Sequence, residues 1–265
     1  GATTPEPSLA EQLAAIAQMN PAPQVSEQPV GLTTLPCDPV LARGLGDGVE
    51  GESFYCGIFT VPQNWDAPDG RNLELSFVVA KATGDDPAPD PLVFLAGGPG
   101  QSSLVASIGA YDQVRPTHDI VRLAQRGSAF GQRLGEEECL ALAAQSDDAA
   151  ALVEQLLAAS NEADAGSEAA VGEAAGQLDQ LCWDLFTEQG LDLNQFTTAA
   201  SARDLVEFIK ALGYETYNLH GISYGSRLAM TIMGGVPGVE DAPVLRSVVL
   251  DSTFPPSLYL LSSVP

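Results

Sequence analysis

The stretch Gly221-Ile222-Ser223-Tyr224-Gly225 constrains the fold of this chain more than any other. It has the pattern Gly-x-Ser-x-Gly, in which a strand turns sharply into a helix and holds a serine hydroxyl above the sheet. The positions two before and two after the serine come close together across such a turn, so a side chain at either would collide. The serine itself takes a strained backbone conformation that the surrounding packing must enforce. The pattern predicts that Ser223 is a nucleophile.

The residues on either side of this pattern support the interpretation. The preceding segment, Thr216–His220, is rich in aromatic and β-forming residues and predicts a strand. The following segment, Ser226–Met233, predicts a helix that ends before Gly234, Gly235 and Pro237. Because the five-residue pattern alone also occurs by chance, this order of strand, turn and helix is what favours a nucleophile over an ordinary glycine turn.

A second glycine-rich stretch, Ala96 to Ser103, follows another expected strand. Pro91–Leu95 is a continuous apolar run, as expected of a strand that is buried on both faces. We expect the residues after it to form a loop that approaches the substrate closely, because glycines leave the backbone accessible. The loop residues are Gly97, Gly98, Pro99, Gly100 and Gln101.

If Ser223 attacks a carbonyl carbon, negative charge develops on the carbonyl oxygen and backbone N–H groups must stabilise it. We expect one donor from Tyr224, directly after the nucleophile, and the other from Gly98, with Gly97 as the second candidate. Pro99 has no N–H and cannot serve. The alternatives are a plain turn and, less favoured, a nucleotide-binding loop, which would need a phosphate-binding motif that the sequence lacks.

Strands and helices alternate along most of the chain. Two early strands joined by a turn-rich segment, 62–70, predict an antiparallel hairpin. From residue 91 onward the alternation predicts a mainly parallel, doubly wound α/β sheet. A capping-box pattern at Ser201–Asp204 predicts a helix that ends at Gly213. The expected strands are 54–61, 73–79, 91–95, 120–124, 216–220 and, as a last buried strand, 245–251.

The expected domain organisation is simple. Residues 1–35 are rich in proline and alanine around one helix candidate, 8–19, and predict a flexible extension. Residues 36–265 would form one partial catalytic domain. Within it, residues 136–190 are dominated by alanine, glutamate and leucine and predict a helical insertion with a break near 161–167.

The four cysteines, Cys37, Cys56, Cys139 and Cys182, form an even set without the spacing of a metal site. Cys37 and Cys56 bracket a glycine-rich loop, and Cys139 and Cys182 lie near the two ends of the helical insertion. The sequence therefore predicts the disulfides Cys37–Cys56 and Cys139–Cys182, no metal site, and export to the extracellular space or the periplasm.

The composition limits the possible partners. The net charge is −24 with only 11 Lys and Arg residues, which argues against binding to nucleic acid or to an anionic membrane surface. No apolar run approaches the roughly 20 residues that a membrane-spanning helix needs. We expect no cofactor, and a peptide or small ester as the substrate.

Several of these motifs together resemble a known family. The motifs occur in this order along the chain: Leu95–Ser102, Gln125–Gly127, Gly221–Arg227, Ser247–Asp251 and then Pro255-Pro256. Their combination resembles the α/β-hydrolase fold and, more narrowly, the secreted tripeptidyl aminopeptidase and proline iminopeptidase group of serine peptidases.

The resemblance covers residues 36–258. It implies an exported aminopeptidase that releases short peptides from substrate N-termini through an acyl-enzyme. Two departures, Ala96 in place of the usual histidine and Ala124 in place of the usual aspartate, bear on substrate detail more than on fold.

The general base is difficult to place. In this fold the acid and the histidine follow the serine along the chain, yet His118 and His220 both precede Ser223. We expect His220 to point into the sheet and His118 to lie at the end of the sheet away from Ser223. Asp251 could be an acid, although in the family the acid comes one strand later.

We therefore expect the N-terminal half of a longer enzyme. Its last strands, lid, acid and histidine would lie beyond Pro265, and residues 1–265 alone would be inactive. Two alternatives stay open: an esterase or lipase-like hydrolase on the same fold, and a catalytically dead binding module.

Overall fold

The computed structural model describes residues 29–46, 48–106, 108–162 and 168–257. These residues form two compact units: residues 133–193 make up one, and the rest of the described chain makes up the other. The predicted helix at 8–19 lies outside the described residues.

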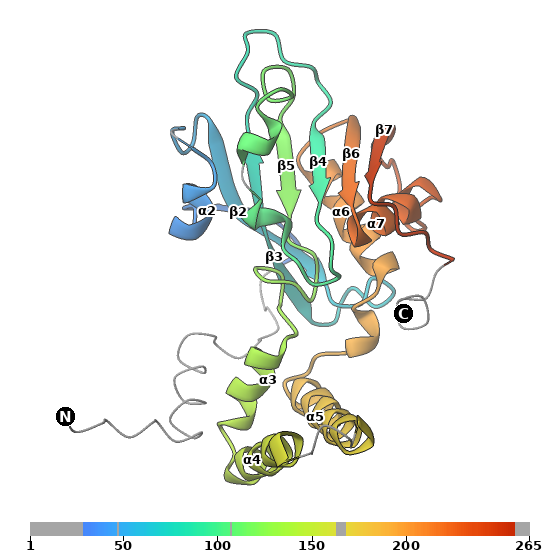
Figure 1. The fold of residues 1–265 in the computed structure, drawn as a ribbon. Helices are drawn as coiled ribbons and strands as arrows, with labels where there is room; N and C mark the ends of the chain where they lie inside the picture. The colour runs from blue at the N-terminus through green and yellow to red at the C-terminus, as the bar shows by residue number, and fades with distance from the viewer. Residues whose placement is uncertain (1–28, 47, 107, 163–167, 258–265) are drawn as a thin grey trace, which may run out of the picture. The chain divides into compact units, whose positions relative to one another are not determined.

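The larger unit is built on a mixed sheet. Among the described residues it has seven strands in the order β1-β2-β3-β5-β4-β6-β7 (Figure 1). β1, β2, β3 and β5 pair antiparallel in turn, whereas β5, β4, β6 and β7 run parallel. The strands are β1 (Gly31–Leu35), β2 (Phe54–Pro62), β3 (Asn72–Ala80), β4 (Leu92–Leu95), β5 (Ile120–Leu123), β6 (Thr216–Ile222) and β7 (Val244–Asp251).

Side chains alternate between the two faces of the sheet along each strand, so apolar residues lie on both faces. Both faces are covered by other elements. On one face lie α6 (Thr198–Ala211) and α7 (Tyr224–Met233). There the ring of Phe208 packs on Phe59 and Phe77, with centroids 5.4 and 5.1 Å apart. On the other face, Val78 and Phe94 belong to a second apolar cluster. That cluster includes residues of α2 (Pro39–Arg43), η1 (Ser103–Val105) and η2 (Ile108–Tyr111).

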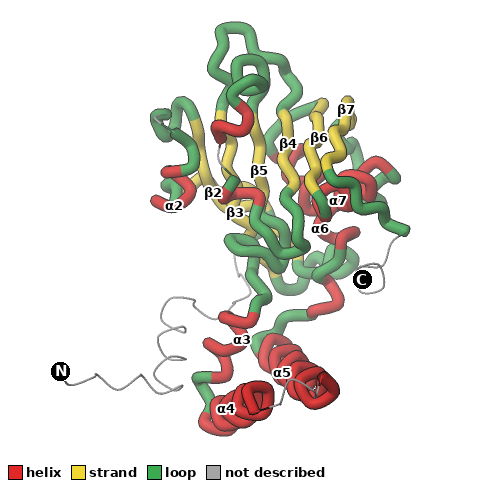
Figure 2. The backbone as a smooth tube through the Cα atoms, viewed as in Figure 1, coloured by secondary structure: helices red, strands yellow, loops and turns green. Residues whose placement is uncertain are grey.

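A mainly parallel sheet covered on both faces, with an antiparallel beginning, is the predicted architecture. It is the α/β-hydrolase fold, in which the strand before the sharp turn lies centrally among parallel neighbours. Figure 2 shows these strands side by side, each joined to the next by helix or loop. The sequence therefore predicted the fold class correctly.

Residues 133–193 form the second unit, which is helical. Its helices are α3 (Glu136–Ala143), α4 (Asp147–Glu162) and α5 (Glu168–Glu188), and η3 (Leu193–Gln195) begins at its end. Leu140, Ala143, Ala149 and Val153 are buried in its core, and Leu178, Leu181 and Leu185 of α5 pack against them. No helix in the described ranges is long and apolar enough to cross a membrane.

The structure contains both predicted disulfides. Cys37 bonds to Cys56 and thereby ties the segment after β1 to β2. Cys139 bonds to Cys182 and joins α3 to α5. No cysteine of the described chain is left free.

Two expectations need correction. Residues 31–35 were expected in the extension, but they form β1, whose Thr33 pairs with Ile58 of β2. The helix expected from Ser201 begins earlier: Thr197 is the N-cap, and its hydroxyl accepts from the N–H of Ala200 at 3.1 Å. β7, the last of the expected strands, forms an edge of the described sheet, where Val244 and Val249 are 63% and 56% exposed.

The buried carboxylate of Asp90 holds together the end of the sheet away from Ser223. The carboxylate of Asp90 accepts from Asn218 of β6 and from Arg246 of β7. His118 precedes β5, and its Nε2 lies 3.9 Å from the same carboxylate. Burial by itself raises the pKa of Asp90, but the hydrogen bonds from Asn218 and Arg246 outweigh it and leave the pKa below its ordinary value.

Removing the Cys139–Cys182 disulfide by a double serine substitution should destabilise the protein. The bond closes a chain separation of 43 residues, and in the chain-entropy model such a crosslink contributes about 4 kcal/mol to the free energy of unfolding. The same model predicts about 0.7 kcal/mol less for Cys37–Cys56, with its separation of 19 residues. Urea denaturation followed by far-UV circular dichroism measures both variants. Unchanged stability, or free thiols in the unreduced protein by peptide mapping, would contradict this account.

Candidate functional site

Ser223 lies between the end of β6 and the start of α7, at the turn that the sequence predicted. Its backbone has φ of 54° and ψ of −118°, a conformation that L-residues rarely adopt. The N–H of Ser223 donates to the carbonyl of Asp251 at 2.9 Å, and its own carbonyl accepts from the N–H of Ser226 at 2.9 Å. These contacts from β7 and α7 hold the strained residue in place.

The two glycines around Ser223 are required by close backbone packing. A Cβ at Gly221 would lie 2.4 Å from the carbonyl oxygen of Gly225. A Cβ at Gly225 would lie 2.1 Å from the carbonyl oxygen of Leu95 in β4. Both distances are far below any real contact, so no other residue fits either position without moving the backbone. The steric argument made from the sequence therefore holds for both glycines.

The glycine-rich loop after β4 passes beside Ser223. A Cβ at Gly97 would lie 3.1 Å from Cβ of Ser223 and 3.5 Å from its Oγ. Gly98 and Gly100 both have positive φ, 105° and 98°, so the chain turns tightly at this point. Gly100 and Gln101 are exposed. The structure thus brings the loop residues Gly97–Gln101 and the serine to the same end of the sheet.

Tyr224 opens α7, so its N–H is one of the first donors of the helix, which have no partner within the helix. Its side chain is buried and is fixed by a second helix, because the hydroxyls of Tyr224 and Thr198 lie 2.8 Å apart. Thr198 is the first residue of α6. The N-termini of α6 and α7 are therefore joined next to the serine.

Polar side chains that the sequence analysis did not assign fix the start of the glycine loop. The N–H of Ala96 donates to Oγ of Ser103 at 3.1 Å, and Nε2 of Gln125 donates to the carbonyl of Ala96 at 3.4 Å. The guanidinium of Arg122 donates to the carbonyls of Leu104 and Ala106. Burial lowers the pKa of Arg122 to about 10. For the contact between Gln125 and Ala96, the sequence signal was the motif Gln125-Arg126-Gly127.

Arg126, the middle residue of that motif, forms a buried ion pair with Asp204 of α6. Its Nε and Nη2 donate to the two carboxylate oxygens at 2.7 and 2.6 Å. The side chains of both residues are almost fully buried, at 0% and 2% exposed. Nε1 of Trp65 donates to the same carboxylate at 2.8 Å, and Arg126 also donates to the carbonyl of Gln63. The network joins the β2–β3 loop, the end of β5 and α6.

Neither histidine of the sequence lies where a base for Ser223 would be needed. The ring of His220 packs against Phe94 and Tyr111, with centroids 5.7 and 6.0 Å away. Its Nδ1 lies 3.3 Å from the hydroxyl of Tyr111, whose pKa is raised by burial. His118 lies beside Asp90 at the far end of the sheet. The contacts of both histidines therefore indicate a packing role and not a role as the base for Ser223.

Asp251, the candidate acid, ends β7 and is exposed. Its carboxylate accepts from the hydroxyl of Ser252 at 3.2 Å, while its carbonyl accepts from the N–H of Ser223. Its backbone thus positions the serine. In the described ranges no group of three or more His, Cys, Asp or Glu residues is arranged to hold a metal ion.

The sequence of this chain was compared with those of known proteins. No protein-family model matches it. It is 27% identical to serine protease Hip1 of Mycobacterium tuberculosis over 207 residues, which are 76% of this chain and 36% of that protein. It is 28% identical to tripeptidyl aminopeptidase of Streptomyces coelicolor over 216 residues, which are 77% of this chain and 36% of that protein. The chain resembles bacterial serine peptidases. It spans about a third of the length of these curated relatives.

Solved structures of α/β hydrolases are also similar. The proline iminopeptidase-related protein of Thermus thermophilus is 19% identical, with a TM-score of 0.38 over 73% of this chain and 43% of that chain. An α/β hydrolase of Novosphingobium aromaticivorans is 13% identical, with a TM-score of 0.40 over 77% of this chain and 45% of that chain. The named sequence relatives support the group to which the motifs pointed.

Replacing Asp204 with asparagine should destabilise the larger unit strongly. The change leaves the guanidinium of Arg126 buried without its counter-charge, which costs roughly 3–5 kcal/mol when one partner of a buried pair is removed. Glu207→Gln, on the same helix but half-exposed, is the matched control and should change stability little. The free energy of unfolding of each variant, measured by urea denaturation, tests this expectation. Equal stability of the two variants would show that the network does not support α6.

Proposed function

We propose that this chain carries the nucleophile and the oxyanion hole of a serine hydrolase. The observation that carries the proposal is the placement of Ser223, at φ of 54° between β6 and α7, with Gly97 directly beside its hydroxyl. A strained serine at a strand-to-helix turn, next to a glycine-rich loop from a neighbouring parallel strand, is the arrangement used for acyl transfer.

In this mechanism Oγ of Ser223 attacks the carbonyl carbon of the substrate and loses its proton to a general base. The oxyanion accepts hydrogen bonds from the N–H of Tyr224 and from the N–H of Gly98, with Gly97 as the second candidate. Pro99, Gly100 and Gln101 complete the loop that the substrate meets. The base returns the proton to the leaving amine, and water then releases the acyl group from Ser223.

The general base of this proposal is a histidine outside the 265 residues. Two observations support it: His220 is packed against Phe94 and Tyr111, and His118 lies beside Asp90. The acid that orients the base would come from the same source, with Asp251 as the alternative. An unactivated serine hydroxyl is a weak nucleophile, so these 265 residues alone would turn over substrate slowly.

The substrate would be a peptide, cleaved near its N-terminus, and the enzyme would be an exported aminopeptidase. The names of the relatives, a serine protease and a tripeptidyl aminopeptidase, support a peptide over an ester. The two disulfides support export, because such bonds persist in oxidising compartments.

A fluorophosphonate probe should modify Ser223 in the protein as its natural host makes it. An activated serine reacts with such probes because its hydroxyl attacks phosphorus as it would attack a carbonyl carbon. Mass spectrometry of the labelled peptide locates the adduct, and Ser223→Ala should abolish it. Ser146→Ala, in the helical unit, is the control and should label like the unchanged protein. Labelling that survives Ser223→Ala, or that maps to Ser102 or Ser226, would refute the assignment.

The same preparation can test the substrate class. Tripeptidyl anilides with a free N-terminus, the same anilides with an acetylated N-terminus, and short acyl esters form the panel. An aminopeptidase should cleave the first at least tenfold faster than the second. Preference for the esters would favour the lipase-like alternative instead, without affecting the assignment of Ser223.

A further inference from the structure

The helical unit contains a cavity of about 490 Å³, within the size range of small-molecule sites. All the residues that line it belong to this unit. They come from the start of α3, from one side of α5 and from the segment that follows α5. The disulfide between Cys139 and Cys182 joins α3 to α5 at the cavity wall and so fixes their spacing.

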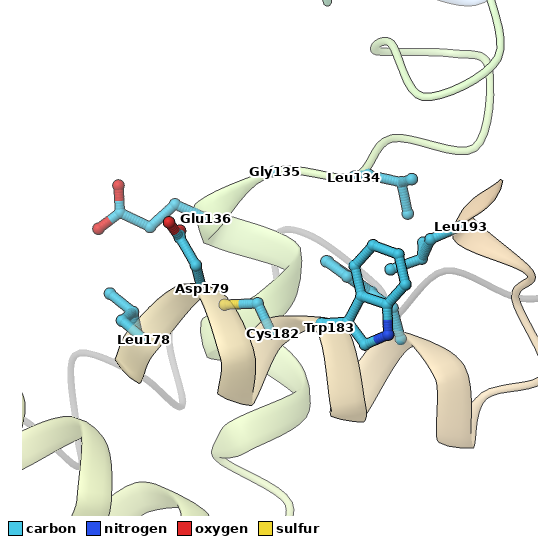
Figure 3. Close-up of a pocket in the computed structure, with 9 residues that line it drawn as sticks. Leu134, Gly135, Glu136, Leu178, Asp179, Cys182, Trp183 and Leu193 are labelled. Atoms are coloured by element: carbon cyan, nitrogen blue, oxygen red, sulfur yellow. The ribbon is translucent and has the colours of Figure 1, made fainter. Parts of the chain in front are cut away.

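One side of the cavity is apolar. Figure 3 shows the indole of Trp183 beside Leu193, with Leu134 next to them. Trp183 is 46% exposed, which is unusual for a large aromatic side chain, whereas Phe186, which also lines the cavity, is buried. An exposed aromatic ring at the edge of an apolar hollow is a surface that an apolar ligand group can cover.

The other side of the cavity is acidic. Figure 3 shows the side chains of Glu136 and Asp179 at the end of the cavity away from the indole of Trp183. Asp179 and Trp183 lie one helical turn apart on α5, so the carboxylate and the ring share one face of the helix. A ligand in the cavity would thus meet an acidic end and an apolar end.

Within the described part of the helical unit, no basic side chain pairs with the acidic end of the cavity. Arg133 is the only Lys, Arg or His between residues 133 and 193 of the sequence. It is engaged with Glu137 at 2.8 Å and with Glu138 at 3.4 Å. Within the described ranges neither Glu136 nor Asp179 forms an ion pair. Three glutamates in the first turn of α3 also outweigh the positive end of that helix.

We propose that this cavity binds a small organic cation in which an ammonium group is attached to an apolar chain or ring. The ammonium would lie between Glu136 and Asp179, and the apolar part would cover Trp183 and Leu193. An anion would be repelled by both carboxylates, and a neutral apolar molecule would gain no charge interaction with them. A free amine and the N-terminus of an apolar peptide share this chemistry. The site does not depend on the role of Ser223.

Titration calorimetry with matched probes tests the charge requirement. 4-Phenylbutylamine should bind at least tenfold more tightly than 4-phenylbutanol, and 4-phenylbutyrate should not bind measurably. Phe-Leu amide with a free N-terminus and its acetylated form provide the peptide arm. Binding of the amine alone identifies a free amine as the source of the ammonium. Binding of the dipeptide amide, with or without the amine, identifies the peptide N-terminus. Both results support the proposal.

Three variants locate the site. Glu136→Gln and Asp179→Asn should each weaken binding of the probe that binds by about twofold to fivefold, as expected for exposed charge pairs. Trp183→Ala should weaken it by about tenfold. Glu173→Gln, exposed on α5 but outside the cavity, removes the same charge and should have no effect. Circular dichroism checks that each variant folds.

Fluorine NMR of the fluorotryptophan-labelled protein gives a second readout without substitution. The chain has two tryptophans, and Trp65 lies in the larger unit, bonded to Asp204. The probe that binds should shift the signal of Trp183 and leave that of Trp65 in place. The proposal would be overturned if Glu173→Gln weakened binding as much as the cavity variants, or if the alcohol bound as tightly as the amine. It would also be overturned by a shift confined to the Trp65 signal, or by the lack of saturable binding of either ammonium probe.

Discussion

The close approach of Gly225 to the carbonyl of Leu95 is the contact on which the candidate site depends. Because Gly225 has no side chain, the first turn of α7 can lie directly against the end of β4; any Cβ at this position would collide with the carbonyl of Leu95. That contact brings the glycine-rich loop, which continues from β4, to the hydroxyl of Ser223. The positive φ of Ser223 is then fixed by the hydrogen bond from its N–H to the carbonyl of Asp251 in β7. Three neighbouring parallel strands thus determine one side-chain position.

The polar side chains buried around this contact extend the same constraint. Ser103 and Gln125 fix both backbone groups of Ala96, directly before the glycine loop. Arg126 and Asp204 join α6 to the end of β5. Thr198 at the start of α6 then meets the side chain of Tyr224. A nucleophile needs a rigid frame, because hydrogen-bond donors must already point at the oxyanion before it forms.

The sequence predicted the central sheet and the turn at Ser223 because these features have local causes. Apolar runs mark buried strands, and the glycines mark close backbone contacts. The start of α6 was misplaced because Thr197 and Ser201 both suit an N-cap, and the aspartate that suggested a capping box at Ser201 is instead engaged with Arg126, 78 residues away. β1 was missed because its pairing with β2 is decided by tertiary contacts. The cavity beside Trp183 was not predictable, since it depends on how α3 and α5 pack.

Turnover of peptide anilides by the purified 265-residue chain tests the central claim most directly. The claim proposed here is that Ser223 is a nucleophile beside an oxyanion hole, and that neither His118 nor His220 serves as its base. The unchanged chain, Ser223→Ala and His220→Ala should then hydrolyse the anilides at indistinguishable rates, orders of magnitude below those of ordinary enzymes. Rapid turnover by the unchanged chain that is lost in both variants would contradict the account. It would show that His220 leaves Tyr111 and takes the proton of Ser223.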